Sequence, residues 1–114
     1  MGEENKACKR RRYRMEFIDC FNRKIELSDV RWDHIIETHP EIKKLKKELE
    51  GALIEPELIR RSVYNQKVIL FYRHYKHIYE GKYMCVVVRL DEKSIVTAYI
   101  TDRIKSGDVI WKKN

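Results

Sequence analysis

The sequence predicts one α+β domain, with N-terminal helices packed on one face of a C-terminal antiparallel β-sheet meander. Three observations lead to this prediction. The length of 114 residues fits a single domain with one core. Apolar residues recur at helical spacing between residues 29 and 53. Three later runs, VILFYRHY, KYMCVVVR and SIVTAYIT, are rich in strand-forming residues and are joined by short turns, which is typical of an antiparallel meander.

We expect the domain to cover residues 14–114 and to follow a disordered, basic tail of residues 1–13. Residues 1–14 carry six basic side chains against two acidic ones, and so contribute four of the seven net positive charges. A tail of this kind can bind phosphates, but such runs are often only solvated. The remaining body is modestly basic, which fits a nucleic-acid partner without requiring one.

Two short strands are predicted ahead of the helices. The run YRMEFIDC at residues 13–20 alternates apolar and polar side chains, and after a turn near Asn22 the pattern continues through Lys24–Leu27.

A first helix is predicted over about residues 29–38. Ser28 is a natural N-cap, and Pro40 disfavours helical backbone at the residue before it. A second amphipathic helix is predicted over residues 41–53, and Pro56 is expected to open a third, short helical turn.

The three β-rich runs are predicted to have one apolar and one mixed face. The apolar face, which the helices would cover, holds Met84, Val86, Val88, Leu90, Val96, Ala98 and Ile100. If Val68 and Leu70 also face the core, the mixed face holds Phe71, Arg73, Tyr75, Tyr83, Cys85, Val87, Arg89, Ile95, Thr97, Tyr99 and Thr101.

The mixed face has side chains suited to binding RNA. Aromatic rings stack on unpaired bases, guanidinium groups hold phosphates, and hydroxyls bond backbone or base edges. The same residues are also ordinary for a solvated antiparallel face, and composition alone favours that simpler interpretation. The candidate RNA-binding side chains are Arg73, Arg89, Tyr75, Tyr99, Thr97 and Thr101.

Neither a metal nor a cofactor is predicted. His34 and His39 are five residues apart, so they point in different directions on a helix and are poorly placed to chelate one ion. No CxxC pair and no glycine-rich phosphate loop occurs. His39 projects along the apolar stripe of its helix and is expected to be packed, whereas His34 points away from that stripe.

We predict a cytoplasmic protein without a membrane-bound part. The longest apolar run, Met84–Val88, has five residues, against the roughly 20 that a spanning helix needs. Three widely spaced cysteines do not form a disulfide framework, which suits a reducing compartment.

Several short motifs carry a resemblance to a known superfamily. The run RWDHIIETHPEI, the segment LIEPELI and the strand VTAYIT follow one another in the chain. In this order they resemble the small phage- and plasmid-associated nuclease domains of the barnase–EndoU–colicin–RelE (BECR) superfamily, over about residues 13–111. Those domains have an HI…HP motif on their helices, a proline-marked turn and a curved antiparallel sheet ending in a TAY-like strand.

The resemblance implies a metal-independent ribonuclease. The 2′-oxygen of RNA would attack phosphorus and leave a 2′,3′-cyclic phosphate, helped by a general base, a general acid and cationic side chains. On the matching motifs, His34 is the candidate acid or base, and Thr97 and Tyr99 would position phosphate or share in proton transfer. His39 matches the motif as well. Barnase-like enzymes use a carboxylate base on the sheet, and the predicted mixed face has none, whereas RelE-like relatives use mainly basic and tyrosine residues.

Three functions remain open at this point. The first is a ribonuclease acting as a toxin or phage-related effector, with an inhibitor or antitoxin protein as a further partner. The second is a non-catalytic module that binds RNA or DNA through the same face. The third is a protein-interaction partner in a toxin–antitoxin-like system, anchored by Trp32 or Trp111. The resemblance puts the ribonuclease first; without it the binding module would lead.

Overall fold

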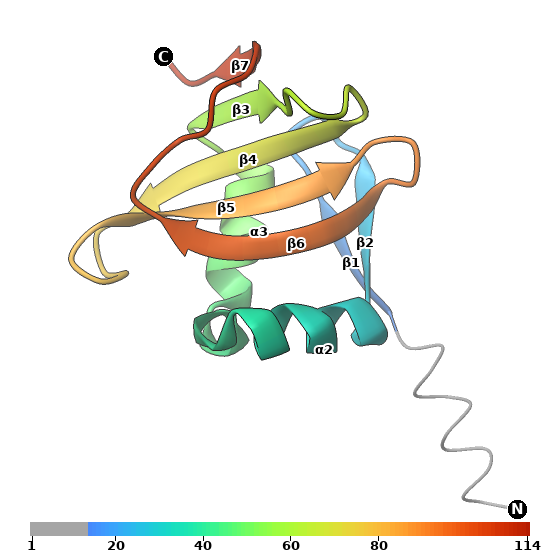
Figure 1. Cartoon of the computed structure of the whole chain (residues 1–114), viewed down its shortest axis with the longest axis vertical. Helices are drawn as coiled ribbons and strands as arrows, with labels where there is room; N and C mark the ends of the chain where they lie inside the picture. The colour runs from blue at the N-terminus through green and yellow to red at the C-terminus, as the bar shows by residue number, and fades with distance from the viewer. Residues whose placement is uncertain (1–13) are drawn as a thin grey trace, which may run out of the picture.

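The computed structural model describes residues 14–114, and the predicted tail of residues 1–13 lies outside that range. The described chain is an α+β fold in which a twisted seven-stranded sheet has two α-helices on one side (Figure 1). In chain order the elements are β1 (Arg14–Ile18), β2 (Lys24–Ser28), α2 (Asp29–Thr38), η1 (Pro40–Lys44), α3 (Lys46–Ile54), β3 (Leu58–Arg61), β4 (Val68–Tyr75), β5 (Lys82–Arg89), β6 (Ser94–Thr101) and β7 (Val109–Lys112).

The predicted fold class was wrong in two respects. Strands rather than helices begin the described chain, because the β1–β2 hairpin precedes α2. The sheet is mixed rather than a purely antiparallel meander: its order is β1-β2-β6-β5-β4-β3-β7, and β2 lies parallel to β6 through the pair Glu26 and Ser94. The antiparallel β4-β5-β6 core of the sheet does follow the prediction. Within the described residues no helix is long and apolar enough to cross a membrane.

The first helix was predicted correctly because its start signal is local. Helix α2 begins after Ser28, whose hydroxyl accepts a hydrogen bond from the backbone N–H of Arg31 at 3.1 Å. The predicted second helix is instead divided into the 3₁₀ segment η1 and the helix α3. The predicted third helical turn was wrong, because Leu58–Arg61 forms strand β3, which pairs with both β4 and β7.

The face of the sheet that carries the helices, called the covered face here, holds the main core. Helix α3 crosses β4 and β5 on this side, whereas α2 lies beside β6 (Figure 1). The fully buried residues of the covered face are Ile69, Phe71, Met84, Val86, Val88 and Ala98.

The opposite face, called the open face here, has a small second cluster. It contains Leu70, Tyr72 and Cys85, all buried, with the half-buried Val87 and Tyr99 against them. The open face is thus not a plain solvated surface: part of it is packed, and the chain after β6 lies over it.

Strand β4 has the opposite phase to the one predicted from Val68 and Leu70. Phe71 pairs with the core residue Val86, whereas Leu70 pairs with Val87 on the open face. Because side chains alternate along a strand, Arg73 and Tyr75 follow Phe71 to the covered side. The two residues were predicted for the mixed face and lie on the other one.

A bulge in the β5–β6 ladder makes a second correction. The register shifts between Val87 and Val88, so that Thr97 stays opposite Val87 while Ile95 comes opposite Val88. Ile95 is therefore buried in the core of the covered face rather than on the mixed face.

Candidate functional site

A groove of about 520 Å³ runs over the open face. Its floor includes the apolar side chains of Leu70 and Val87, and Thr97 and Tyr99 of β6 form part of its lining. The lining also includes Lys105, from the segment after β6, and Tyr64, from the β3–β4 connection. Tyr64 is almost fully exposed. The groove thus combines an apolar floor with an ammonium group, several hydroxyls and two aromatic rings.

Tyr99 is the centre of this arrangement. Its ring centroid lies 5.8 Å from that of His39, at the end of α2, and 5.6 Å from the Nζ atom of Lys105. Its hydroxyl is buried beside Cys85 and Tyr72 but meets the geometry of a hydrogen bond with no described residue. A buried hydroxyl without a partner is uncommon, and this one would have to turn outward before it could donate to a ligand.

The two phenols and the thiol of this cluster, Tyr99, Tyr72 and Cys85, stay protonated at neutral pH. Burial, reinforced by the neighbouring Cys85, raises the pKa of Tyr99 far above its ordinary value. Burial raises the pKa of Tyr72 to about 12 and that of Cys85 to about 11. Tyr99 therefore keeps its proton as a hydrogen-bond donor and is unsuited to acting as a base.

Hydrogen bonds fix the segment that carries Lys105. The backbone N–H of Lys105 donates to the hydroxyl of Tyr72 at 3.0 Å, and its carbonyl accepts from the guanidinium of Arg60 at 3.3 Å. Sequence reasoning missed both Lys105 and Tyr72. The basic DRIKSG run that follows the TAYIT strand was the available signal for Lys105, and the phase of β4 hid Tyr72.

His39 is half-buried at the C-terminal end of α2. Its backbone N–H closes the helix on the carbonyl of Ile35 at 2.7 Å, which directs the side chain toward β6. Besides its contact with Tyr99, the Nδ1 atom lies 4.0 Å from a carboxylate oxygen of Glu41. His39 thus packs against Tyr99, a lining residue of the groove, but does not itself line the groove.

His34 is exposed and takes part in no side-chain hydrogen bond or ion pair with the described residues. It shares one side of α2 with Arg31 and Thr38, three residues before it and four after it. Arg31 borders the start of β6 at Ser94. His34 lies five residues before His39 on the helix, apart from the contact between His39 and Tyr99.

Arg73 and Tyr75 do not join the groove. The guanidinium of Arg73 bonds the Glu55 carboxylate at 3.1 Å, and the hydroxyl of Tyr75 donates to the backbone carbonyl of Glu48 at 2.9 Å. Both partners lie on or just after α3, so these two side chains tie the helix to the covered face.

Arg89 and Thr101 lie at the ends of their strands. Arg89 is held by Asp91, with Nε and a carboxylate oxygen 2.9 Å apart, so its charge is already balanced locally. The hydroxyl of Thr101 bonds the backbone N–H of Arg103 at 3.0 Å and caps the turn after β6. Of the predicted site residues, His39, Thr97 and Tyr99 come together, whereas Arg73, Tyr75 and Arg89 do not.

Carboxylates are absent from the described lining of the groove. Among residues 14–114 no three His, Cys, Asp or Glu side chains are close enough together to hold a metal ion.

The chain matches no protein-family model, no curated protein and no solved structure. The resemblance to BECR nuclease domains therefore stays a prediction, and any function rests on the chemistry of the groove.

Proposed function

We propose that the protein is a metal-independent endoribonuclease that cleaves RNA in the groove of the open face. The observation that carries this proposal is the contact between His39 and Tyr99 beside the ammonium group of Lys105. An imidazole exchanges protons near neutral pH, a protonated phenol donates a hydrogen bond, and an ammonium group balances phosphate charge.

In the proposed reaction His39 takes the proton of the ribose 2′-OH. The 2′-oxygen then attacks phosphorus, the bond from phosphorus to the 5′-oxygen breaks, and a 2′,3′-cyclic phosphate remains. The departing 5′-oxygen takes up a proton in return. His34 is our candidate for this second transfer, because its imidazole is exposed on the same helix and has no side-chain partner within residues 14–114.

The remaining groove residues would hold the phosphate and the nucleoside. Tyr99 and Lys105 would stabilise the charge that develops on the phosphorane oxygens, and Thr97 would position the ground-state phosphate. The exposed ring of Tyr64 offers a stacking surface for a base at the rim.

A cytoplasmic setting suits this activity. The described cysteines, Cys20 and Cys85, are both free, as in a reducing compartment. A nuclease made where cellular RNA is abundant needs restraint, which gives an inhibitor or antitoxin protein as the expected second partner.

The test is cleavage of a fluorescent RNA oligonucleotide by the purified protein in EDTA. We expect a 2′,3′-cyclic phosphate product and a rate loss of about 100-fold or more in His39→Ala, the scale for removing a general base. His34→Ala should lose a similar factor if it makes the second transfer. His74→Ala is the matched control, because this imidazole packs edge-on against Tyr83 away from the groove.

Activity that depends on added divalent metal, or that survives in both the His39 and His34 variants, would contradict the mechanism. A parent protein that binds RNA through the groove and cleaves none would instead be a binding module.

A further inference from the structure

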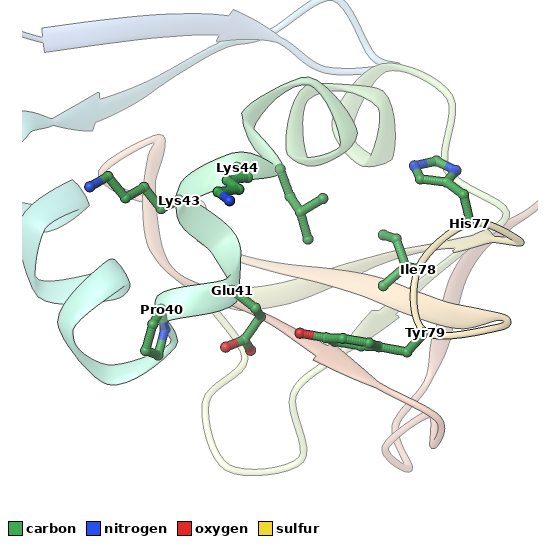
Figure 2. A pocket seen from close by; sticks show the side chains of 8 residues that line it. Pro40, Glu41, Lys43, Lys44, His77, Ile78 and Tyr79 are labelled. Carbon is green, nitrogen blue, oxygen red and sulfur yellow. The ribbon is translucent and has the colours of Figure 1, made fainter.

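A second hollow, of about 610 Å³, opens between η1 and the turn that joins β4 to β5 (Figure 2). Lys43 and Lys44 extend from η1 on one side, and Tyr79 lies on the other. Both lysines are exposed, and neither forms an ion pair with the described residues. Leu45 and the buried Ile78 supply an apolar part of the lining.

Tyr79 lies in a turn whose backbone is strained. Its φ is +45°, and Glu80 and Gly81 follow with φ of +64° and +113°. Positive φ at a bulky residue is costly, on the order of 1 kcal/mol or more, and persists only where the surroundings enforce it. Here the buried Ile78 anchors the turn and its carbonyl accepts from the N–H of Gly81 at 2.8 Å. The result is an aromatic ring that is 65% exposed at the edge of the hollow.

This hollow extends toward β6, the strand whose Thr97 and Tyr99 line the candidate catalytic groove. A smaller surface hollow shares Tyr79 and Glu41 with it and reaches Thr101 at the end of β6. Thr101 is four residues beyond Thr97, which is about 13 Å along a strand. At about 3.4 Å per stacked nucleotide this distance corresponds to roughly four nucleotides. One short RNA segment could therefore contact both places.

The charges along this path favour a polyanion at the lysine end. Asp102, near Thr101, lies 3.6 Å from Lys82, and Glu41 lies 4.0 Å from the imidazole of His39. The third nearby carboxylate, Glu48, bonds His77 at 2.8 Å. Glu80, next to Tyr79, is exposed and has no ion-pair partner among the described residues, so Lys43 and Lys44 together leave one positive charge in excess.

We propose that this hollow is a second nucleotide subsite, in which a base stacks on Tyr79 and the adjoining phosphates lie against Lys43 and Lys44. The subsite rests on the proposed ribonuclease function and adds to it a preference for RNA several nucleotides longer than the cleaved dinucleotide. Stacking on an aromatic side chain contributes about 1–3 kcal/mol per base, which is about 5- to 150-fold in affinity.

The test compares an eight-nucleotide RNA with a dinucleotide, using the full chain at about 150 mM salt, where the screening length is about 8 Å. In the parent protein we expect the longer RNA to bind at least about tenfold more tightly, as one stacked base would provide. Lys43→Ala with Lys44→Ala, and separately Tyr79→Asn, should each remove most of that advantage. Asparagine suits the left-handed backbone, so the second variant removes the ring without adding strain.

Lys47→Ala with Lys76→Ala is the charge-matched control, because both lysines are exposed nearby and neither lines the hollow. The subsite is refuted if the length advantage persists in the Lys43/Lys44 and Tyr79 variants, or falls equally in this control. Equal binding of an oligonucleotide without bases, or equal competition by poly-glutamate, would also overturn it, since both keep the charge and lack the stacking group. Dinucleotide cleavage by the parent is scored separately and tests only the proposed catalysis.

Discussion

The two faces of the β4-β5-β6 sheet are built from alternate residues of the same strands, yet they treat polar groups in opposite ways. On the covered side, the hydroxyl of Tyr75 and the guanidinium of Arg73 are bonded to α3 and to the residue that follows it. On the open side, the hydroxyl of Tyr99 and the Nε atom of Arg60 are buried without a partner among the described residues. Native proteins satisfy most buried polar groups, so the open face is one place where unpaired atoms remain; Arg23 and Asp29, elsewhere in the fold, carry the others among the described residues.

This difference separates stability from function along one strand. A residue and its neighbour on β5 are less than 4 Å apart along the chain, but one packs into the core and the next lines the groove. The same substitution at the two positions should therefore have different consequences, which gives the largest test of the comparison.

Val88→Asp should unfold the domain. Val88 is fully buried in the core, and an unpaired carboxylate there should cost more than about 4 kcal/mol, among the largest effects of single substitutions. Val87→Asp is the matched variant, because Val87 lines the groove and is only half-buried. We expect it to fold with a loss of about 1 kcal/mol, the span of strand propensities, and to bind RNA poorly because it adds a negative charge to the groove. Urea unfolding followed by circular dichroism measures the stability of both variants. Similar stabilities would mean that the two faces do not differ in burial, and a larger loss in Val87→Asp would mean that the faces are assigned the wrong way round.

The phase of β4 shows what the sequence could not supply. The run VILFYRHY is apolar at both alternate sets of positions in its first half, so period-two reasoning has no basis for choosing the core-facing set. The choice is made by the pairing of Phe71 with Val86, a long-range contact. The error moved Arg73 and Tyr75 onto the wrong face and concealed Tyr72.

Local signals, by contrast, predicted local structure well. The Ser28 cap and the proline at position 40 gave the limits of α2, and Thr97 and Tyr99 of the predicted TAY strand both line the groove. The partnership of β2 with β6 and the position of Lys105 over Tyr99 depend on how distant segments return to the sheet. No spacing in the sequence encodes those returns, so the mixed sheet and half of the groove were missed.

Alkaline pH should weaken the open-face cluster selectively. Burial raises the pKa of Cys85 from 9.0 to about 11, so its contribution to stability is complete below pH 9 and is lost as pH rises toward 11. By linkage the loss is about 1 kcal/mol at pH 10 and about 2 kcal/mol at pH 11. Cys85→Ala should flatten this dependence, measured as the difference in unfolding free energy between pH 7 and pH 10. Cys20 is present in both proteins, so its own raised pKa cancels in the comparison. A variant that retains the full pH dependence would mean that the thiol is not desolvated in the fold.

The smallest effect expected is on the covered face, at the contact between Tyr75 and α3. Tyr75→Phe removes the hydrogen bond to the Glu48 carbonyl and should cost about 1 kcal/mol, with RNA cleavage unchanged because the ring lies away from the groove. Gly51 on α3 offers a second test of the same contact, because it lies next to the Tyr75 hydroxyl. A methyl group at Gly51 would overlap the Tyr75 hydroxyl but would be 3.5 Å from the ring carbon that bears it, an ordinary contact.

Gly51→Ala should therefore fail to stabilise the parent protein, although alanine is favoured over glycine in a helix by about 1 kcal/mol. In the Tyr75→Phe background the same substitution should recover about that amount, so that the two changes show an interaction energy of about 1 kcal/mol or more in a double-mutant cycle. Urea unfolding of the four proteins measures the cycle. Additive effects would show that Tyr75 does not reach α3. A cleavage rate that falls in Tyr75→Phe would show that this residue acts in RNA binding, as predicted from the sequence.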